Sequence, residues 1–116
     1  MSNISSDVMR GYIDLIILRV LYDGDSYGYA ISKKVTDISE NTYVMKETTL
    51  YSAFSRLERL NYVRSYPGLY SGGRERTYYA LTNEGLLYYR HKCEEWVATQ
   101  ELISKFMKEG YENGRN

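Results

Sequence analysis

Apolar residues recur along most of this chain at the three- and four-residue spacing of amphipathic helices. Four helices are expected, over residues 5–22, 27–38, 46–60 and 82–108. Between the last two, residues 62–66 and 76–81 are rich in β-branched and aromatic side chains and enclose a Ser-Gly-Gly turn at Ser71, Gly72 and Gly73. This predicts a β-hairpin, so the expected fold class is mainly α with a small β wing (α+β).

Local signals set the expected boundaries. Residues able to cap a helix start lie at the beginning of three of the four segments: Ser5, Ser6, Asp7, Ser26 and Thr82. Lys46 stands at the start of the third, so that helix is expected to begin without a side-chain cap. Gly28 is expected to permit close packing early in the second helix. Residues 43–45 are expected to add a short strand to the hairpin.

The third helix and the hairpin predict a DNA-binding element. Leu50, Phe54, Leu57 and Leu60 form an apolar face, and the opposite face carries hydroxyl groups and cations that donate to phosphate oxygens and base edges. A helix followed at once by a hairpin with a basic, glycine-rich tip is typical of winged helix-turn-helix proteins, in which the helix enters the major groove. The candidate DNA contacts are Lys46, Thr48, Tyr51, Ser52, Ser55, Arg74 and Arg76. For these basic residues the alternative is a solvated surface, and for Tyr51 a partly buried position.

The fourth helix carries a heptad pattern. Its seam residues are Leu86, Tyr89, Cys93, Trp96, Gln100, Ile103 and Met107, spaced three and four apart. We interpret it as a long C-terminal dimerisation helix, with interface contacts from Leu86, Tyr89, Cys93, Trp96, Ile103 and Met107. The alternative is an amphipathic helix that folds back on its own core. The expected organisation is a winged helix-turn-helix domain at 1–82, the dimerisation helix at 83–109 and a flexible tail at 110–116.

Charge supports this placement of the DNA contacts. The 116 residues have a formal net charge of zero, yet residues 46–79 hold six Lys and Arg against three Glu. Residues 1–45 hold four basic against six acidic side chains, and residues 80–116 hold five against six. The local excess coincides with the predicted DNA-binding element, and its small size favours a dimer that uses neutral hydrogen bonds.

Other function classes find little support. His91 and Cys93 are two residues apart on a helix and point to different faces, and no phosphate loop is present, so we predict no enzyme and no catalytic residue. The single cysteine predicts neither a disulfide nor a metal site, and no cofactor is expected. The aliphatic run at residues 15–18 is too short to span a membrane, and the start of the chain does not resemble a signal peptide. We therefore expect a cytoplasmic protein.

Four motifs in this order resemble those of one family. They are SYGYAI at residues 26–31, TLYSAFSRLE at 49–58, GGRERTYYALTNEG at 72–85 and EEW at 94–96. Together they resemble the PadR family of winged-helix transcriptional regulators, and within it the short LmrR-like members. The resemblance covers nearly the whole chain.

The resemblance also implies a ligand site. In LmrR-like proteins the tryptophans of two subunits face each other across a central pore and hold flat hydrophobic compounds between them. The residue at that position here is Trp96, and the residues expected around the pocket are Leu15, Tyr22, Tyr89, Cys93, Trp96 and Gln100. The alternative is that Trp96 only anchors the dimer.

These observations lead to one expected function and one rival. We expect a homodimeric repressor that binds a palindromic operator in double-stranded DNA and is relieved by a small aromatic or cationic ligand at the dimer interface. The rival is a winged-helix protein-interaction adaptor that does not bind DNA. The local positive charge and the Gly-Gly-Arg tip favour the first.

Overall fold

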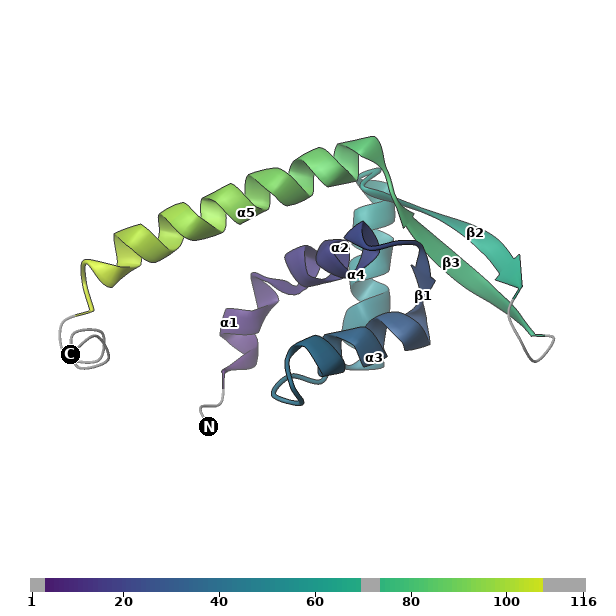
Figure 1. The fold of residues 1–116 in the computed structure, drawn as a ribbon, viewed down its shortest axis with the longest axis horizontal. Coiled ribbons are helices and arrows are strands. Elements are labelled where there is room, and N and C mark those ends of the chain that lie inside the picture. The colour runs from purple at the N-terminus through teal and green to yellow at the C-terminus, as the bar shows by residue number, and fades with distance from the viewer. Residues whose placement is uncertain (1–3, 70–73, 108–116) are drawn as a thin grey trace.

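A computed structural model describes residues 4–69 and 74–107 and confirms the expected fold class (Figure 1). In chain order its elements are α1 (Ser6–Arg10), α2 (Ile13–Tyr22), β1 (Ser26–Tyr27), α3 (Gly28–Ile38), α4 (Glu47–Arg59), β2 (Val63–Leu69), β3 (Glu75–Leu81) and α5 (Asn83–Ser104). The strands form an antiparallel sheet in the order β1-β3-β2. The predicted turn residues Ser71, Gly72 and Gly73 and the predicted tail at 110–116 lie outside the described residues.

The expected continuous helix over residues 5–22 is wrong, because the chain breaks between α1 and α2. The amide of Gly11 donates to the carbonyl of Val8, and the amide of Tyr12 donates to the carbonyl of Met9. At the break the backbone hydrogen bonds therefore span three residues and not the four of an α-helix. Glycine is a poor residue for a helix interior, which explains the position of the break. The predicted cap is confirmed, since Ser5 Oγ accepts a hydrogen bond of 3.2 Å from the amide of Val8.

The third strand lies elsewhere than expected. Residues 43–45 form no strand, and Met45 is instead buried in the core. The third strand is β1, in which Ser26 pairs with Tyr79 and Tyr27 with Tyr78. Ser26 is therefore part of the sheet and does not cap α3, whose N-cap residue is Tyr27. A two-residue strand has no periodicity to detect in the sequence.

The core lies between the helices α2, α3 and α4 and the inner face of the sheet. Its largest fully buried side chains are Phe54, Ile17, Leu18, Ile31, Leu50, Leu57 and Val63. The rings of Phe54 and Tyr79 stack with centroids 3.7 Å apart, which fixes α4 against β3. Burial of this apolar surface is the main term that stabilises the domain.

The long helix α5 extends away from this body (Figure 1). Thr82 caps it as predicted, since its Oγ1 accepts a hydrogen bond of 2.9 Å from the amide of Gly85, and the helix ends at Ser104 rather than near residue 108. Gly85 is its only buried residue. The radius of gyration is 16.4 Å, whereas a compact chain of this length has about 13 Å. The projecting helix accounts for this excess.

Candidate functional site

Helix α4 has one buried and one open face. Leu50, Ala53, Phe54 and Leu57 are buried, whereas Leu60, expected on the same face, is 47% exposed just past the helix end. The predicted DNA contacts on this helix and at its start are all exposed: Lys46, Thr48, Tyr51, Ser52 and Ser55. As expected, Lys46 makes no side-chain cap. The open face thus consists mainly of hydroxyl groups, which can donate to phosphate oxygens or base edges.

Tyr51 is partly buried and still has a surface that DNA could contact, so it fits both positions expected for it. Its side chain is 46% exposed, yet its ring meets Phe54 edge-on at 5.6 Å and its hydroxyl lies over Gly28. A Cβ at Gly28 would stand 2.4 Å from that oxygen, so the glycine permits the close approach of α3 and α4. The phenol of Tyr51 is therefore held in place at the start of the open face.

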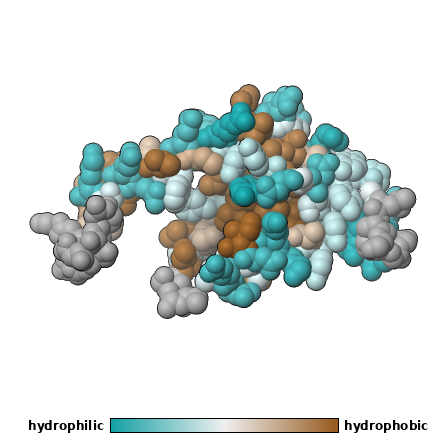
Figure 2. All heavy atoms as spheres, in the orientation of Figure 1, coloured by the Kyte–Doolittle hydropathy of each residue, from teal (hydrophilic) through white to brown (hydrophobic). Residues whose placement is uncertain are grey.

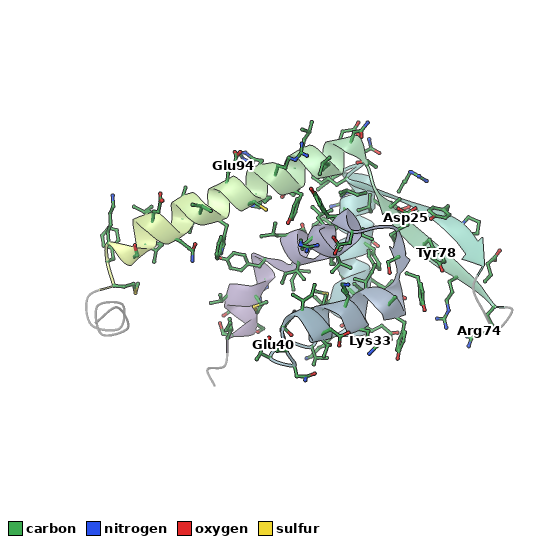
Figure 3. All side chains as sticks on the ribbon, viewed as in Figure 1. Asp25, Lys33, Glu40, Arg74, Tyr78 and Glu94 are labelled. Atoms are coloured by element: carbon green, nitrogen blue, oxygen red, sulfur yellow. The ribbon has the colours of Figure 1, made fainter. Side chains whose placement is uncertain are left out.

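The wing brings two arginines to this side of the molecule. Arg74 is exposed at the free end of the hairpin (Figure 3). Arg76 is half-buried, with its guanidinium 5.2 Å from the centre of the Tyr27 ring. Arg76 and Tyr51 line one hollow of about 250 Å³, together with Glu47 at the start of α4. One predicted contact from α4, Tyr51, and one from the wing, Arg76, thus lie beside the same hollow.

A row of tyrosines crosses the outer face of the sheet. Tyr27, Tyr78 and Tyr66 lie opposite one another on the three strands, with ring centroids 5.4 and 5.8 Å apart. The Tyr66 hydroxyl donates a hydrogen bond of 2.6 Å to Asp25, which raises the pKa of the phenol. The Tyr78 ring occupies the space that a Cβ at Gly68 would take. Part of the tyrosine content of this chain therefore stiffens the wing.

Arg56 differs from the other cations of α4. Its guanidinium donates to both carboxylate oxygens of Asp14 in α2, with the Nε to Oδ2 distance at 3.1 Å. The hydrogen bond raises the pKa of Arg56. This arginine joins two helices of the body.

A cavity of about 770 Å³ lies between α2, α3 and α5. Four of the six predicted ligand residues line it, namely Leu15, Tyr89, Cys93 and Trp96. The other two predicted residues, Tyr22 and Gln100, do not line this cavity within the single chain. Tyr22 packs behind the wall against Tyr89, with ring centroids 5.6 Å apart, and Gln100 lines a separate hollow further along α5.

The sequence reasoning missed one wall of this cavity. The lining residues that it did not name include Ile16 and Val20 of α2, Val35 and Ile38 of α3, and Tyr43. Helical spacing does not distinguish a core from a cavity wall, so the residues from α2 and α3 could not be identified as lining from the sequence. Figure 2 shows hydrophobic side chains at the surface between α5 and the helices beneath it.

The cavity is mainly apolar, with polar groups near Trp96. Burial and a hydrogen bond with Cys93 raise the pKa of Tyr89, so its phenol stays protonated at neutral pH. Arg19 is the only charged residue among the described lining residues, and it pairs with Asp23 at 2.8 Å. Such a site suits an aromatic molecule with few polar groups.

The heptad seam of α5 changes along its length. Leu86, Tyr89 and Cys93 are half-buried against the body, but Trp96, Ile103 and Met107 are 42%, 46% and 47% exposed. Glu94 points to the side of α5 away from the body (Figure 3). Within one chain, the C-terminal half of the seam therefore faces solvent.

Residues 4–69 and 74–107 offer neither a metal site nor a membrane span. These ranges contain no group of three or more His, Cys, Asp or Glu side chains arranged to hold a metal ion. None of the described helices has the length and apolar character required to cross a membrane.

Known proteins resemble this chain over most of its length. A model of the transcriptional regulator PadR-like family matches residues 17–91. The structure of a transcriptional regulator from Clostridium thermocellum is 56% identical, with a TM-score of 0.83, and the match covers 90% of this chain and 99% of that one.

Two further proteins are similar to this chain over most of its length. A PadR family transcription regulator from Clostridium difficile R20291 is 39% identical with a TM-score of 0.73, over 84% of this chain and 99% of that one. An uncharacterized protein of Lysinibacillus sphaericus is 40% identical over 90% of this chain and 96% of its own length.

Proposed function

Because the chain belongs to the PadR-like family of transcriptional regulators, we propose that it is a homodimeric repressor that binds a palindromic operator. A small aromatic or cationic ligand, bound where the two subunits meet, lowers its affinity for that operator. Membership in a family of transcriptional regulators also confirms the prediction that the chain is not an enzyme.

The observation that carries the proposal is the two-sided helix α4 beside the wing. One face is fixed in the core by Leu50, Phe54 and Leu57, and the other presents Thr48 and Ser52 to solvent. In winged helix-turn-helix proteins a helix so placed enters the major groove. Ser52 and Ser55 then approach base edges, while Lys46, Tyr51 and the two wing arginines contact the DNA backbone.

The exposed half of α5 supports a dimer. A helix of 22 residues that buries only Gly85 lacks the tertiary contacts that normally stabilise helices. Its exposed apolar side chains include Trp96, Val97, Leu102, Ile103 and Phe106. Packing against a second copy of the chain covers this surface and sets the distance between the two recognition helices. That distance has to match half-sites about 34 Å apart, one turn of DNA.

The cavity supports a ligand response. Trp96 and Tyr89 supply flat aromatic walls, and α2 and α5 form two of its sides. A planar compound held by stacking also gains about 0.5 to 2 kcal/mol per ring contact if it is cationic. Since α5 sets the spacing of the recognition helices, a ligand that prefers one spacing changes the affinity for DNA.

The DNA-binding part is tested by selecting bound sequences from random DNA and measuring their affinity at several salt concentrations. We expect Arg74→Ala to weaken binding to every sequence and to lower the slope of log affinity against log salt by about one. Arg90→Ala, the same change at an exposed position on α5, is the matched control and leaves the slope unchanged. An equal slope for wild type and Arg74→Ala means that the wing does not touch DNA. A folded dimer that binds no DNA favours the adaptor.

The ligand-binding part is tested through the fluorescence of the single tryptophan. We expect planar aromatic compounds at micromolar concentration to quench Trp96 and to release bound operator. At a concentration where the variant is dimeric, Trp96→Ala should keep the affinity for DNA but lose the release, and Arg90→Ala, at an exposed polar position of α5, is the control. If quenching compounds leave the affinity for DNA unchanged, Trp96 is only an anchor of the dimer.

A further inference from the structure

We propose that Asp14 is a positioning residue that ties the recognition helix α4 to α2, and thereby fixes the half-site spacing that the protein accepts. This rests on the proposed function, because it concerns how the DNA-binding helices are held. Asp14 touches no DNA in this arrangement and acts through Arg56.

The first link joins α2 to α4. The carboxylate of Asp14 accepts from Nε and Nη2 of Arg56, a two-point contact between residues 42 positions apart in sequence. Their side chains are 22% and 40% exposed, respectively, so the contact is partly shielded from water. Two parallel charge-assisted bonds fix orientation as well as distance, unlike a single point contact.

A second link fixes the end of α4 to the start of α5. The rings of Tyr62 and Tyr88 stack with centroids 4.2 Å apart, and Thr82 Oγ1 donates 2.7 Å to the carbonyl of Asn61. A Cβ at Gly85 would stand 2.0 Å from the Tyr62 carbonyl oxygen, so the two backbones are in direct contact. This junction holds α4 at its C-terminal end, and Arg56 holds it one turn earlier.

Because of these links, the position of α4 depends on the distance between α2 and α5. The cavity beside Trp96 lies between α2 and α5, so an occupant that moves one relative to the other acts on the Asp14 contact. Without the carboxylate, Arg56 loses its partner in α2, and α4 is held only by its core face and its end. The two recognition helices of a dimer then tolerate a wider range of separations.

The test compares Asp14→Asn with wild type on DNA of varied half-site spacing. The probes are the selected operator and versions with one base pair added to or removed from its centre, at a temperature where circular dichroism shows every variant folded. We expect the affinity of wild type to fall about tenfold or more when the spacing changes. Asp14→Asn should bind the original operator more weakly than wild type does, and its affinity should fall only about threefold or less when the spacing changes. Arg56→Gln should behave like Asp14→Asn, and Arg56→Lys, which keeps the charge, should recover part of the preference.

The matched control is Asp37→Asn, which removes a carboxylate paired at 3.9 Å with Lys33 of the same helix. It should keep the wild-type spacing preference. If Asp14→Asn binds more weakly yet keeps that preference, its role is purely structural and the proposal is overturned. If Asp14→Asn does not fold, the same criterion applies to Arg56→Gln and Arg56→Lys. Failure of wild type to bind any DNA sequence would overturn the proposed function, and this proposal with it.

Discussion

The two phenylalanines of this chain, one on α4 and one just past the end of α5, have opposite surroundings. Phe54 of α4 is 2% exposed and stacks on Tyr79, whereas Phe106, just past the end of α5, is 72% exposed. Helix α4 buries four residues in 13, but the longer α5 buries only Gly85. Helical spacing in a sequence therefore predicts that a face will be covered, but it does not tell whether the same chain covers it.

The largest expected effect separates these two phenylalanines. Phe54→Ala should lower the free energy of unfolding by about 3 to 5 kcal/mol, because it leaves a cavity in the core. Phe106→Ala removes the same side chain from a surface of the single chain, so it should hardly change the unfolding of a monomer. It should instead raise the concentration at which the dimer dissociates. Urea unfolding gives the first quantity, and light scattering over a dilution series gives the second.

Equal losses of stability for the two variants at low protein concentration would contradict the expected difference between them. They would mean that the residues around Phe106 pack on the chain's own core. Deletion of residues 95–116 is a stronger version of the same test, for which we expect an unstable monomer. A monomer measured for the intact chain would contradict the dimer outright.

A smaller effect is expected at the junction of the two regions. Gly85→Ala should destabilise the chain by about 1 to 3 kcal/mol, because the new methyl group meets the backbone of Tyr62 and not a mobile side chain. Gly11→Ala is the matched control. Its nearest neighbour would be the carbonyl of Val8 at 3.7 Å, and its backbone is already helical, so alanine should stabilise by about 0.4 to 1 kcal/mol. Thermal unfolding of both variants should show shifts of opposite sign.

Most of the fold was predictable because it depends on local patterns. The spacing of Leu50, Phe54 and Leu57 predicted α4, and Thr82 predicted the start of α5. The predictions failed where tertiary contacts, and not the local sequence, determine the secondary structure. Ser26 and Tyr27 form a strand only because β3 lies beside them, and a two-residue pairing leaves no trace in the sequence.

The candidate site was predictable in part for the same reason. Exposure of Thr48 and Ser52 follows from their place opposite the apolar face of α4. The role of Arg56 did not follow, since its partner Asp14 is 42 residues away and a lone arginine on a helix is more often solvated. Likewise the cavity wall from α3 was missed, because residues that line a cavity and residues that fill a core share one pattern.

The smallest expected effect concerns the ion pair of Lys92 and Glu95 within α5. Glu95 is exposed, and its hydrogen bond to Lys92 lowers its pKa below the ordinary value of 4.5. A carboxyl group with a lowered pKa in the folded state stabilises that state above its unfolded pKa, and the stabilisation is lost as the pH falls through the folded pKa. The difference in melting temperature between wild type and Glu95→Gln should therefore be small at neutral pH, begin to shrink as the pH approaches 4.5, and disappear as the pH falls further through the lowered pKa.

The melting temperature of Asp14→Asn tests the contrast between the body that holds α4 and the projecting helix α5. Its pair with Arg56 joins two helices and is more shielded than the Lys92–Glu95 pair, so its removal should lower the melting temperature more at neutral pH. Salt should also distinguish the two, because an exposed pair within one helix is screened more strongly than a partly buried pair between helices. If Glu95→Gln proved the more damaging change, the charges along α5 would be part of a packed interface and not of a solvated surface.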